Sequence, residues 1–194
     1  PAEFYKEFMT DIAEEIDREN KIINDLLSLV KMDKKASDVN IQDTNINDLM
    51  ELIIKRLKPI AAKRNVELLL ENSKPVTAQV DETKLTLAIS NLVENAIKYN
   101  VEDGWVHVSL NADHKYFYVK VEDSGIGIPE EAQEHIFERF YRVDKSHSRE
   151  IGGTGLGLAI TRSAVLMHRG AIKVYSKEGE GTTFTVRIPL QYVE

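Results

Sequence analysis

Hydrophobic residues in the first 32 positions recur with the period of an α-helix. They lie three, four or seven residues apart, and Glu, Asp, Lys and Arg fill the opposite side. This pattern predicts one long amphipathic helix over residues 1–32. The apolar stripe consists of Phe4, Phe8, Ile12, Ile16, Ile23, Leu26 and Val30. We expect a partner helix to cover it in a bundle or coiled coil, although an amphipathic helix lying on its own domain has the same pattern.

Beyond a polar linker at residues 36–44, segments with the strand period alternate with segments of helical period. Strands are expected at 41–46, 66–70, 76–80, 105–110, 116–121, 171–176 and 183–188, and helices at 47–64, 81–99, 130–138 and 155–168. Asn47 is expected to cap the first of these helices and Pro59 to bend it. The inner face of helix 81–99 is predicted to consist of Leu85, Ala88, Ile89, Leu92, Val93 and Ala96. The fold class is therefore α+β: a two-layer α/β sandwich, with a mixed sheet packed on three helices after the long N-terminal helix.

Composition narrows the functional classes. A net charge of -7 over 194 residues argues against a general nucleic-acid binder, because phosphate backbones attract basic surfaces. The absence of cysteine excludes disulfides and thiolate metal sites. No signal peptide and no apolar run long enough to span a bilayer is apparent.

The residues that suggest a chemical function are concentrated between Asn91 and Gly157, beginning in helix 81–99. Asn91 and Asn95 are one turn apart, and Lys98 can join their face. An amide oxygen of Asn95, together with phosphate oxygens and waters, would suit Mg²⁺, and Lys98 would supply a positive charge for the phosphates. Two asparagines decorating a helix surface would produce the same spacing.

Asp123 ends a strand and opens a Ser-Gly-Ile-Gly-Ile-Pro turn. A carboxylate there can accept a hydrogen bond from an adenine amino group. Gly125 and Gly127 would let the backbone approach the ring, since neither has a Cβ. A plain Asp-Ser-Gly turn is the alternative.

The aromatic segment 137–142 follows the predicted helix 130–138. Phe137 and Phe140 are expected to be core anchors, while Arg139 or Arg142 could face a phosphate. The polar, poorly periodic residues after it predict a mobile lid at about 142–154.

Three glycines, Gly153, Gly155 and Gly157, lead directly into helix 155–168. Free N–H groups at a helix start, with the positive end of its dipole, can hold phosphate. The glycine spacing does not match the dinucleotide-binding fingerprint, and no Gly-Lys-Ser/Thr tripeptide of a P-loop occurs.

In this order, the four motifs resemble the ATP-binding catalytic domain of sensor histidine kinases, in the superfamily that includes gyrase, Hsp90 and MutL. The likeness covers roughly residues 45–190, and its details are most similar to cell-wall or phosphate-responsive sensor kinases of Gram-positive bacteria. It implies ATP and Mg²⁺ as cofactors, with Asn95 as the metal ligand. The ATP-binding residues that it implies are Asn91, Asn95, Lys98, Tyr99, Asp123, Gly125, Gly127, Ile128, Arg142, Gly153, Thr154, Gly155, Leu156, Gly157 and Thr182.

One position separates branches of this superfamily. Hydrolysing members carry a glutamate four residues before the metal asparagine, and this chain has Asn91 there, an amide that cannot act as a general base. The site is therefore expected to transfer the γ-phosphoryl group rather than hydrolyse ATP rapidly.

The histidine that should accept the phosphoryl group is not found. None of the five histidines, His107, His114, His135, His147 and His168, matches the family's acceptor motif. Residues 1–35 resemble the second helix of the dimerisation and phosphotransfer hairpin, so we expect a fragment that lacks the first helix and does not autophosphorylate. Self-association through helix 1–32 and binding to a response regulator receiver domain are also expected. The resemblance implies the cytoplasmic portion of a membrane-anchored bacterial sensor, without direct membrane contact by this fragment.

Two other functions remain open from the sequence. One is an ATPase or serine kinase of the same superfamily. The other is an adaptor that keeps the fold but makes no catalytic use of nucleotide. The presence of Asn95, Asp123 and three glycines argues against it, because a nucleotide site that is no longer used would not need to keep them.

Overall fold

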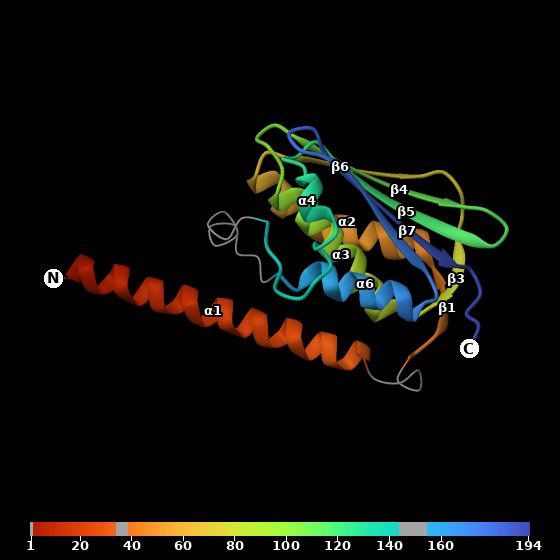
Figure 1. The fold of residues 1–194 in the computed structure, drawn as a ribbon, viewed down its shortest axis with the longest axis horizontal. Coiled ribbons are helices and arrows are strands. Elements are labelled where there is room, and N and C mark those ends of the chain that lie inside the picture. The colour runs from red at the N-terminus through yellow and green to blue at the C-terminus, as the bar shows by residue number, and fades with distance from the viewer. Residues whose placement is uncertain (1, 34–38, 144–154) are drawn as a thin grey trace.

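The computed structural model describes residues 2–33, 39–143 and 155–194. A sheet forms one layer and helices form the other, with a long helix extending away from the domain (Figure 1). The helices are α1 (Ala2–Asp33), α2 (Ile46–Lys63), α3 (Glu82–Lys98), α4 (Glu130–Gln133) and α6 (Gly157–Met167). The strands are β1 (Gln42–Asn45), β2 (Glu67–Asn72), β3 (Thr77–Val80), β4 (Trp105–Ala112), β5 (Tyr116–Asp123), β6 (Ala171–Lys177) and β7 (Gly181–Pro189).

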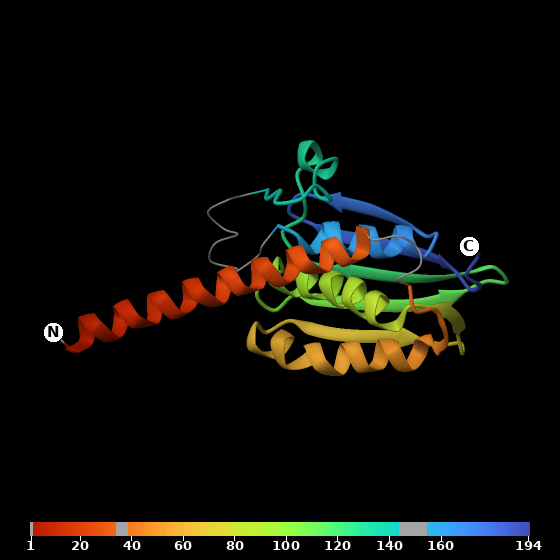
Figure 2. The ribbon, with the colours of Figure 1, turned by 90° about the horizontal axis from the view of Figure 1, so that it is seen from below.

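The main sheet has five strands in the order β2-β4-β5-β7-β6. Only β2 and β4 run parallel, and the other neighbours are antiparallel. Strands β1 and β3 form a separate antiparallel pair. The predicted two-layer sandwich of a mixed sheet on α2, α3 and α6 is confirmed, as Figure 2 shows from below.

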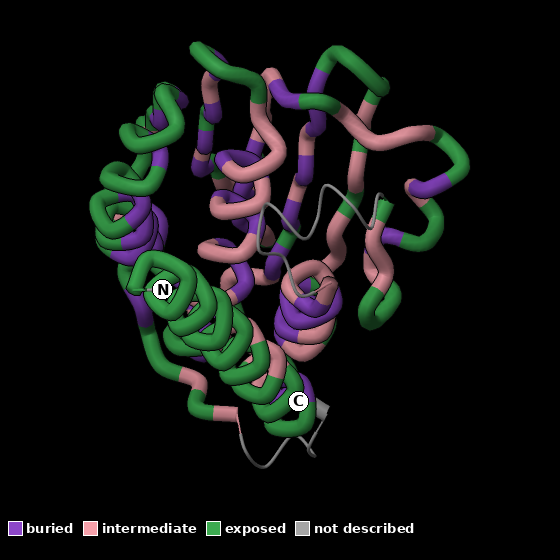
Figure 3. Tube along the Cα trace, turned by 90° about the vertical axis from the view of Figure 1, so that its left-hand side faces the viewer, coloured by how far each residue is buried: buried purple, intermediate pink, exposed green. Residues whose placement is uncertain are grey.

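The core lies between the two layers. Along β4 and β5, buried positions alternate with half-buried or exposed ones, because successive side chains point to opposite faces of a sheet. All six residues predicted for the inner face of α3 are buried. In Figure 3 the buried parts of the trace are accordingly concentrated where helices and strands face each other.

The start of α2 differs from the sequence-based expectation. Asn45, not Asn47, is the N-cap, and its side chain accepts a hydrogen bond from the N–H of Asp48. The amide of Asn47 instead holds the turn before β3, donating to the Lys74 carbonyl and accepting from the Val76 N–H. Pro59 lies inside α2, which continues to Lys63.

The helix expected at 130–138 is also shorter than predicted. It covers only Glu130–Gln133, with Pro129 at its N-cap, and turns follow. Phe137 packs against the core as expected, edge-on to Phe184. Phe140 does not: its side chain is 54% exposed and its φ is 64°. The expectation that Phe140 anchors the core was wrong, because the left-handed backbone turns its side chain outward.

A buried polar network joins α3 to α6. His168, just after α6, accepts a hydrogen bond at Nε2 from the N–H of Asp81, the N-cap of α3. Its Nδ1 lies 2.7 Å from the Ala164 carbonyl oxygen, which assigns the ring proton to Nδ1. Burial lowers the pKa of His168, so the neutral ring that this geometry needs is favoured. His168 is thus structural.

Helix α1 has two differently situated faces. Near its C-terminal end, Leu29 and Met32 are buried, and Ile22 packs with them against α3 and α6. The predicted apolar stripe lies on another side and is exposed, with Phe4 67% and Val30 57% accessible. The residues through which α1 packs on the domain are therefore not those of the predicted apolar stripe. No helix in the described ranges combines the length and hydropathy required to cross a bilayer.

Candidate functional site

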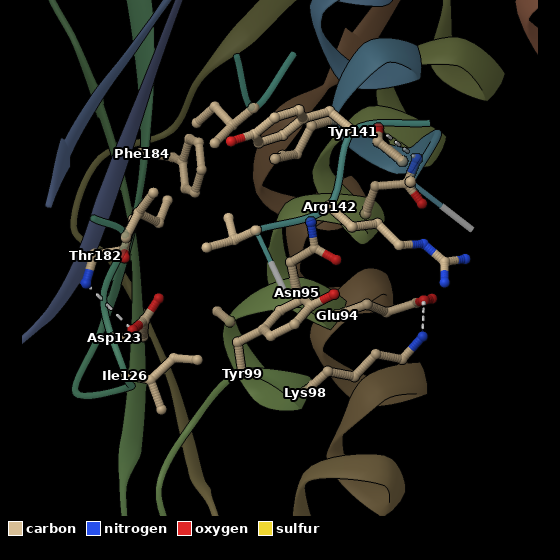
Figure 4. A pocket seen from close by; sticks show the side chains of 18 of the residues that line it. Glu94, Asn95, Lys98, Tyr99, Asp123, Ile126, Tyr141, Arg142, Thr182 and Phe184 are labelled. Atoms are coloured by element: carbon tan, nitrogen blue, oxygen red, sulfur yellow. Dashed lines mark hydrogen bonds and ion pairs between the residues drawn. The ribbon is translucent and has the colours of Figure 1, made fainter. Parts of the chain in front are cut away.

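A cavity opens between the ends of α3, β5 and β7, the segment after α4 and the start of α6. Figure 4 shows side chains from these separate parts of the chain pointing into one space. Eleven of the predicted site residues line it: Asn91, Asn95, Lys98, Tyr99, Asp123, Gly127, Ile128, Arg142, Gly155, Gly157 and Thr182. The fold therefore unites residues that are up to 91 positions apart in the sequence, from Asn91 to Thr182.

Asp123 is fixed at one end of the cavity by the backbone. Its Oδ1 accepts hydrogen bonds from the Gly125 N–H at 2.8 Å and the Thr182 N–H at 3.3 Å. Within the described ranges no donor reaches Oδ2, which leaves this oxygen for a ligand. Burial raises the pKa of Asp123 to about 6, although the two N–H donors oppose that shift. At neutral pH the group is a carboxylate and accepts hydrogen bonds.

Gly125 and Gly127 are required for a reason that the sequence did not reveal. A Cβ on Gly125 would lie 2.4 Å from the Tyr99 carbonyl oxygen. A Cβ on Gly127, whose φ is +71°, would lie 2.2 Å from the Lys177 carbonyl oxygen. Both glycines thus permit contact with the protein's own backbone, and this contact sets the turn that carries Asp123.

Apolar side chains form the walls next to Asp123. Ile126, Ile128 and Phe184 line the cavity there, and Figure 4 shows Phe184 and Ile126 on the side of Asp123. A flat ring with an amino group suits this arrangement, because apolar walls accept its faces and the carboxylate accepts its N–H.

Charged side chains occupy the other side of the cavity, where Figure 4 shows Glu94, Lys98 and Arg142 away from Asp123. Lys98 Nζ lies 3.8 Å from Glu94 Oε2. Burial lowers the pKa of Lys98, as does the positive charge of Lys21, whereas Glu94 and Asp25 oppose the decrease. A cationic group in a partly desolvated site attracts anions strongly.

The two asparagines of α3 have different surroundings. Asn91 Nδ2 donates to the Gly157 carbonyl at 3.3 Å, which ties α3 to the first residue of α6. Thr161 strengthens this junction by donating to the Ala88 carbonyl at 3.0 Å. The side-chain amide of Asn95 has no hydrogen-bond partner among the described residues and lies in the cavity (Figure 4). Asn95 is therefore available to a ligand or metal, while Asn91 also positions α6.

The first turn of α6 faces the same space. Gly155, Gly157 and Leu158 line the cavity. The first N–H groups of a helix have no intrahelical acceptor and carry the positive end of the helix dipole. This end of the cavity therefore presents backbone donors in addition to cationic side chains.

Four predicted site residues do not line the described cavity. Gly125 acts through Asp123. Leu156 is fully buried, in the cluster that includes Leu29 and Ile160, so its side chain serves the core. Gly153 and Thr154 lie outside the described residues, as does most of the predicted lid at 142–154.

Several lining residues were missed by sequence reasoning. Glu94 lies within the Asn91–Tyr99 motif, and Tyr141 next to Arg142, so motif context could have suggested both. Ile126 lies between the two glycines in the same way. Lys21 and Asp25 come from α1, and no local signal in that helix points to a nucleotide site.

A family profile described as "Histidine kinase-, DNA gyrase B-, and HSP90-like ATPase" matches residues 80–192, which include most of the cavity. The chain belongs to this family. The sensor histidine kinase WalK of Bacillus subtilis (strain 168) is 39% identical over 185 residues, which are 94% of this chain and 30% of WalK. The predicted resemblance to sensor histidine kinases of Gram-positive bacteria is thus confirmed, and the chain spans about a third of the length of the curated relatives it matches.

The structural likeness to solved histidine kinases extends beyond the residues that match the family profile. Full-length ShkA in complex with AMPPNP superposes with a TM-score of 0.82 and 26% identity, over 97% of this chain and 39% of ShkA. Histidine kinase ThkA in complex with the response regulator protein TrrA gives a TM-score of 0.75 and 25% identity, over 95% of this chain and 51% of ThkA. Both likenesses extend over nearly the whole chain, α1 included.

Proposed function

We propose that the chain binds Mg-ATP and transfers its γ-phosphoryl group to a histidine on a separate segment, as the catalytic domain of a sensor histidine kinase. The observation that supports this most directly is the polarity of the cavity. An acid between apolar walls lies at one end, and Lys98, Arg142 and the start of α6 lie at the other. The two ends of a nucleotide differ in the corresponding way, with a flat amino-bearing ring at one end and anionic phosphates at the other.

Asn95 fits the role of the magnesium ligand. Its amide faces the cavity without a protein partner in the described ranges, and Mg²⁺ prefers oxygen ligands with few protein atoms. When bound, the ion neutralises charge on the transferring phosphoryl group. The chain's own residues would orient the triphosphate by the Lys98 ammonium, the Arg142 guanidinium and the N–H groups of α6.

Transfer is favoured over hydrolysis by the group at position 91. Asn91 cannot remove a proton from water, and its amide is engaged with the Gly157 carbonyl. Glu94 also lines the cavity, where its Oε2 is paired with Lys98 Nζ at 3.8 Å. Slow release of inorganic phosphate is therefore expected in steady state. Rapid release that Glu94→Gln abolishes would instead identify a related ATPase.

The partners follow from the same proposal. The acceptor would be a histidine on a helix paired with the exposed stripe of α1, and a second copy could cover this stripe in its place. A response regulator would receive the phosphoryl group next, as the kinase–regulator complex among the structural relatives suggests. We also propose that the chain is the cytoplasmic portion of a membrane-anchored sensor, because the ATP that it would use is kept inside the cell.

Calorimetric titration with Mg-ATP tests the central proposal. Asp123→Asn keeps the side-chain shape but replaces the charged acceptor, and we expect it to weaken binding by about 10- to 100-fold. Glu122→Gln is the matched control, because it removes the neighbouring charge of the same strand outside the cavity and should change affinity less than about twofold. Saturable binding that Asp123→Asn leaves unchanged would refute the assignment of the ring end.

A further inference from the structure

Helix α1 reaches the cavity that the domain forms. Lys21 and Asp25 are among its lining residues, together with Asn95 and Lys98 of α3. The two α1 side chains are four residues apart and therefore share one face of the helix. A chain segment more than 60 residues before the first nucleotide motif thus contributes charged groups to the site.

Apolar packing holds this part of α1 in place. Leu29 is 1% and Met32 7% exposed, and both pack with Leu156, Ala159 and Ile160 at the start of α6. Lys21 lies two turns before Leu29 on the same helix, and Ile22 beside it is partly buried against the same cluster. The position of Lys21 over the cavity therefore depends on a packed contact and not on the reach of its side chain alone.

The charges around Lys21 define what it can bind. Lys21 and Lys98 line the same cavity, where Lys21 lowers the pKa of Lys98 while the carboxylates of Glu94 and Asp25 raise it. Two lysines from different helices that share a cavity repel each other. An anion with several oxygens between them would relieve this repulsion, and Arg142 lines the same cavity.

We propose that Lys21 is a phosphate-binding residue of the nucleotide site, supplied by α1 and held in place by the seating of Leu29 and Met32 on α6. The inference rests on the proposed binding of ATP and assigns a further residue that contacts its triphosphate. Binding of the triphosphate and docking of α1 are then coupled: each stabilises the other, to the same extent. The nucleotide would thus favour the orientation of α1 seen in Figure 1.

The test compares ligands that differ only in phosphates. For Lys21→Gln we expect a three- to tenfold weaker affinity for Mg-ATP by calorimetry, about the effect of one partly exposed charge, and an unchanged affinity for adenosine. Lys31→Gln is the matched control, since this lysine is exposed on the same helix and is not among the lining residues. It should leave both affinities unchanged.

A double-mutant cycle separates the role of seating from that of charge. Leu29→Ala should weaken Mg-ATP binding but not adenosine binding, and Lys21→Gln should add little once α1 is unseated. The inference is overturned if Lys21→Gln binds Mg-ATP within twofold of the parent chain, or if it loses adenosine and Mg-ATP equally. The proposed function fails separately, if the parent chain binds neither ligand.

Discussion

At one end of the cavity the Asp123 carboxylate is held by two backbone N–H groups, one from Gly125 in the turn after β5 and one from Thr182 in β7, whereas at the other end Lys21 and Lys98 converge from α1 and α3. The Asp123 end depends on glycines that lie so close to neighbouring carbonyl oxygens that no Cβ would fit. The other end depends on long side chains and on how two helices pack. For the proposed function, the end that would take the adenine ring is therefore preformed by the domain alone, whereas the end that would take the phosphates is complete only when α1 packs on α6.

Gly127→Ala breaks the preformed end and has the largest expected effect. A Cβ there would lie 2.2 Å from the Lys177 carbonyl oxygen, at a φ of +71°. Strain in this backbone region adds to the clash, so the free energy of unfolding should fall by about 2–4 kcal/mol. Urea denaturation measures the change.

Gly157→Ala is the control at the other end. Among the described residues, its Cβ would meet the Asn91 side chain, at 3.8 Å, an ordinary contact. The expected change in stability is within about 1 kcal/mol, in either direction. Equal losses for the two variants would show that the two ends do not differ in their steric demands.

The pH dependence of adenosine binding sharpens the comparison further. The pKa of Asp123 is raised to about 6, so the carboxylate is mostly ionised above this pH and takes up a proton below it. Protonation replaces an acceptor by a donor, and affinity for adenosine should fall by about tenfold between pH 7.5 and pH 5. Asp123→Asn should bind weakly at both pH values. A flat profile in the parent chain would place base recognition on another group.

The sequence predicted the position of the Asp123 turn well because its signals are local. Asp123 ends an alternating strand and is followed by two glycines, and α3 carries its apolar and polar faces with one clear period. Each of these patterns is satisfied within one element and its nearest neighbours. The fold class and the inner face of α3 followed from them. Other lining residues, such as Tyr99, Ile128 and Thr182, were implied only by the family resemblance.

The remaining features depend on contacts that periodicity does not encode. The pattern of α1 identified an apolar stripe, yet Leu29 and Met32 on another side form the contact with α6. Which face is seated depends on the shape of the surface it meets. Lys21 was missed for the same reason. The outward turn of Phe140 also depends on a tertiary contact, because Gly155 approaches the Phe140 backbone so closely that a Cβ on Gly155 would lie 2.9 Å from it.

Asp123→Asn is also expected to have a small effect on stability, with a sign opposite to its effect on binding. Because the folded pKa of Asp123 lies above its ordinary value, the folded state gains protons more readily than the unfolded state. The contribution of Asp123 to the stability of the parent chain should therefore increase as pH falls from 7.5 towards 5. In Asp123→Asn this contribution is absent, while the Gly125 and Thr182 N–H groups keep an oxygen acceptor. At pH 7.5 the variant should be about 1 kcal/mol more stable than the parent, and at pH 5 nearly equal, by thermal unfolding at both pH values. A variant that loses stability at pH 7.5 would mean that the carboxylate stabilises the turn by more free energy than the burial of its charge costs. The Asp123 end would then not be maintained at the expense of stability.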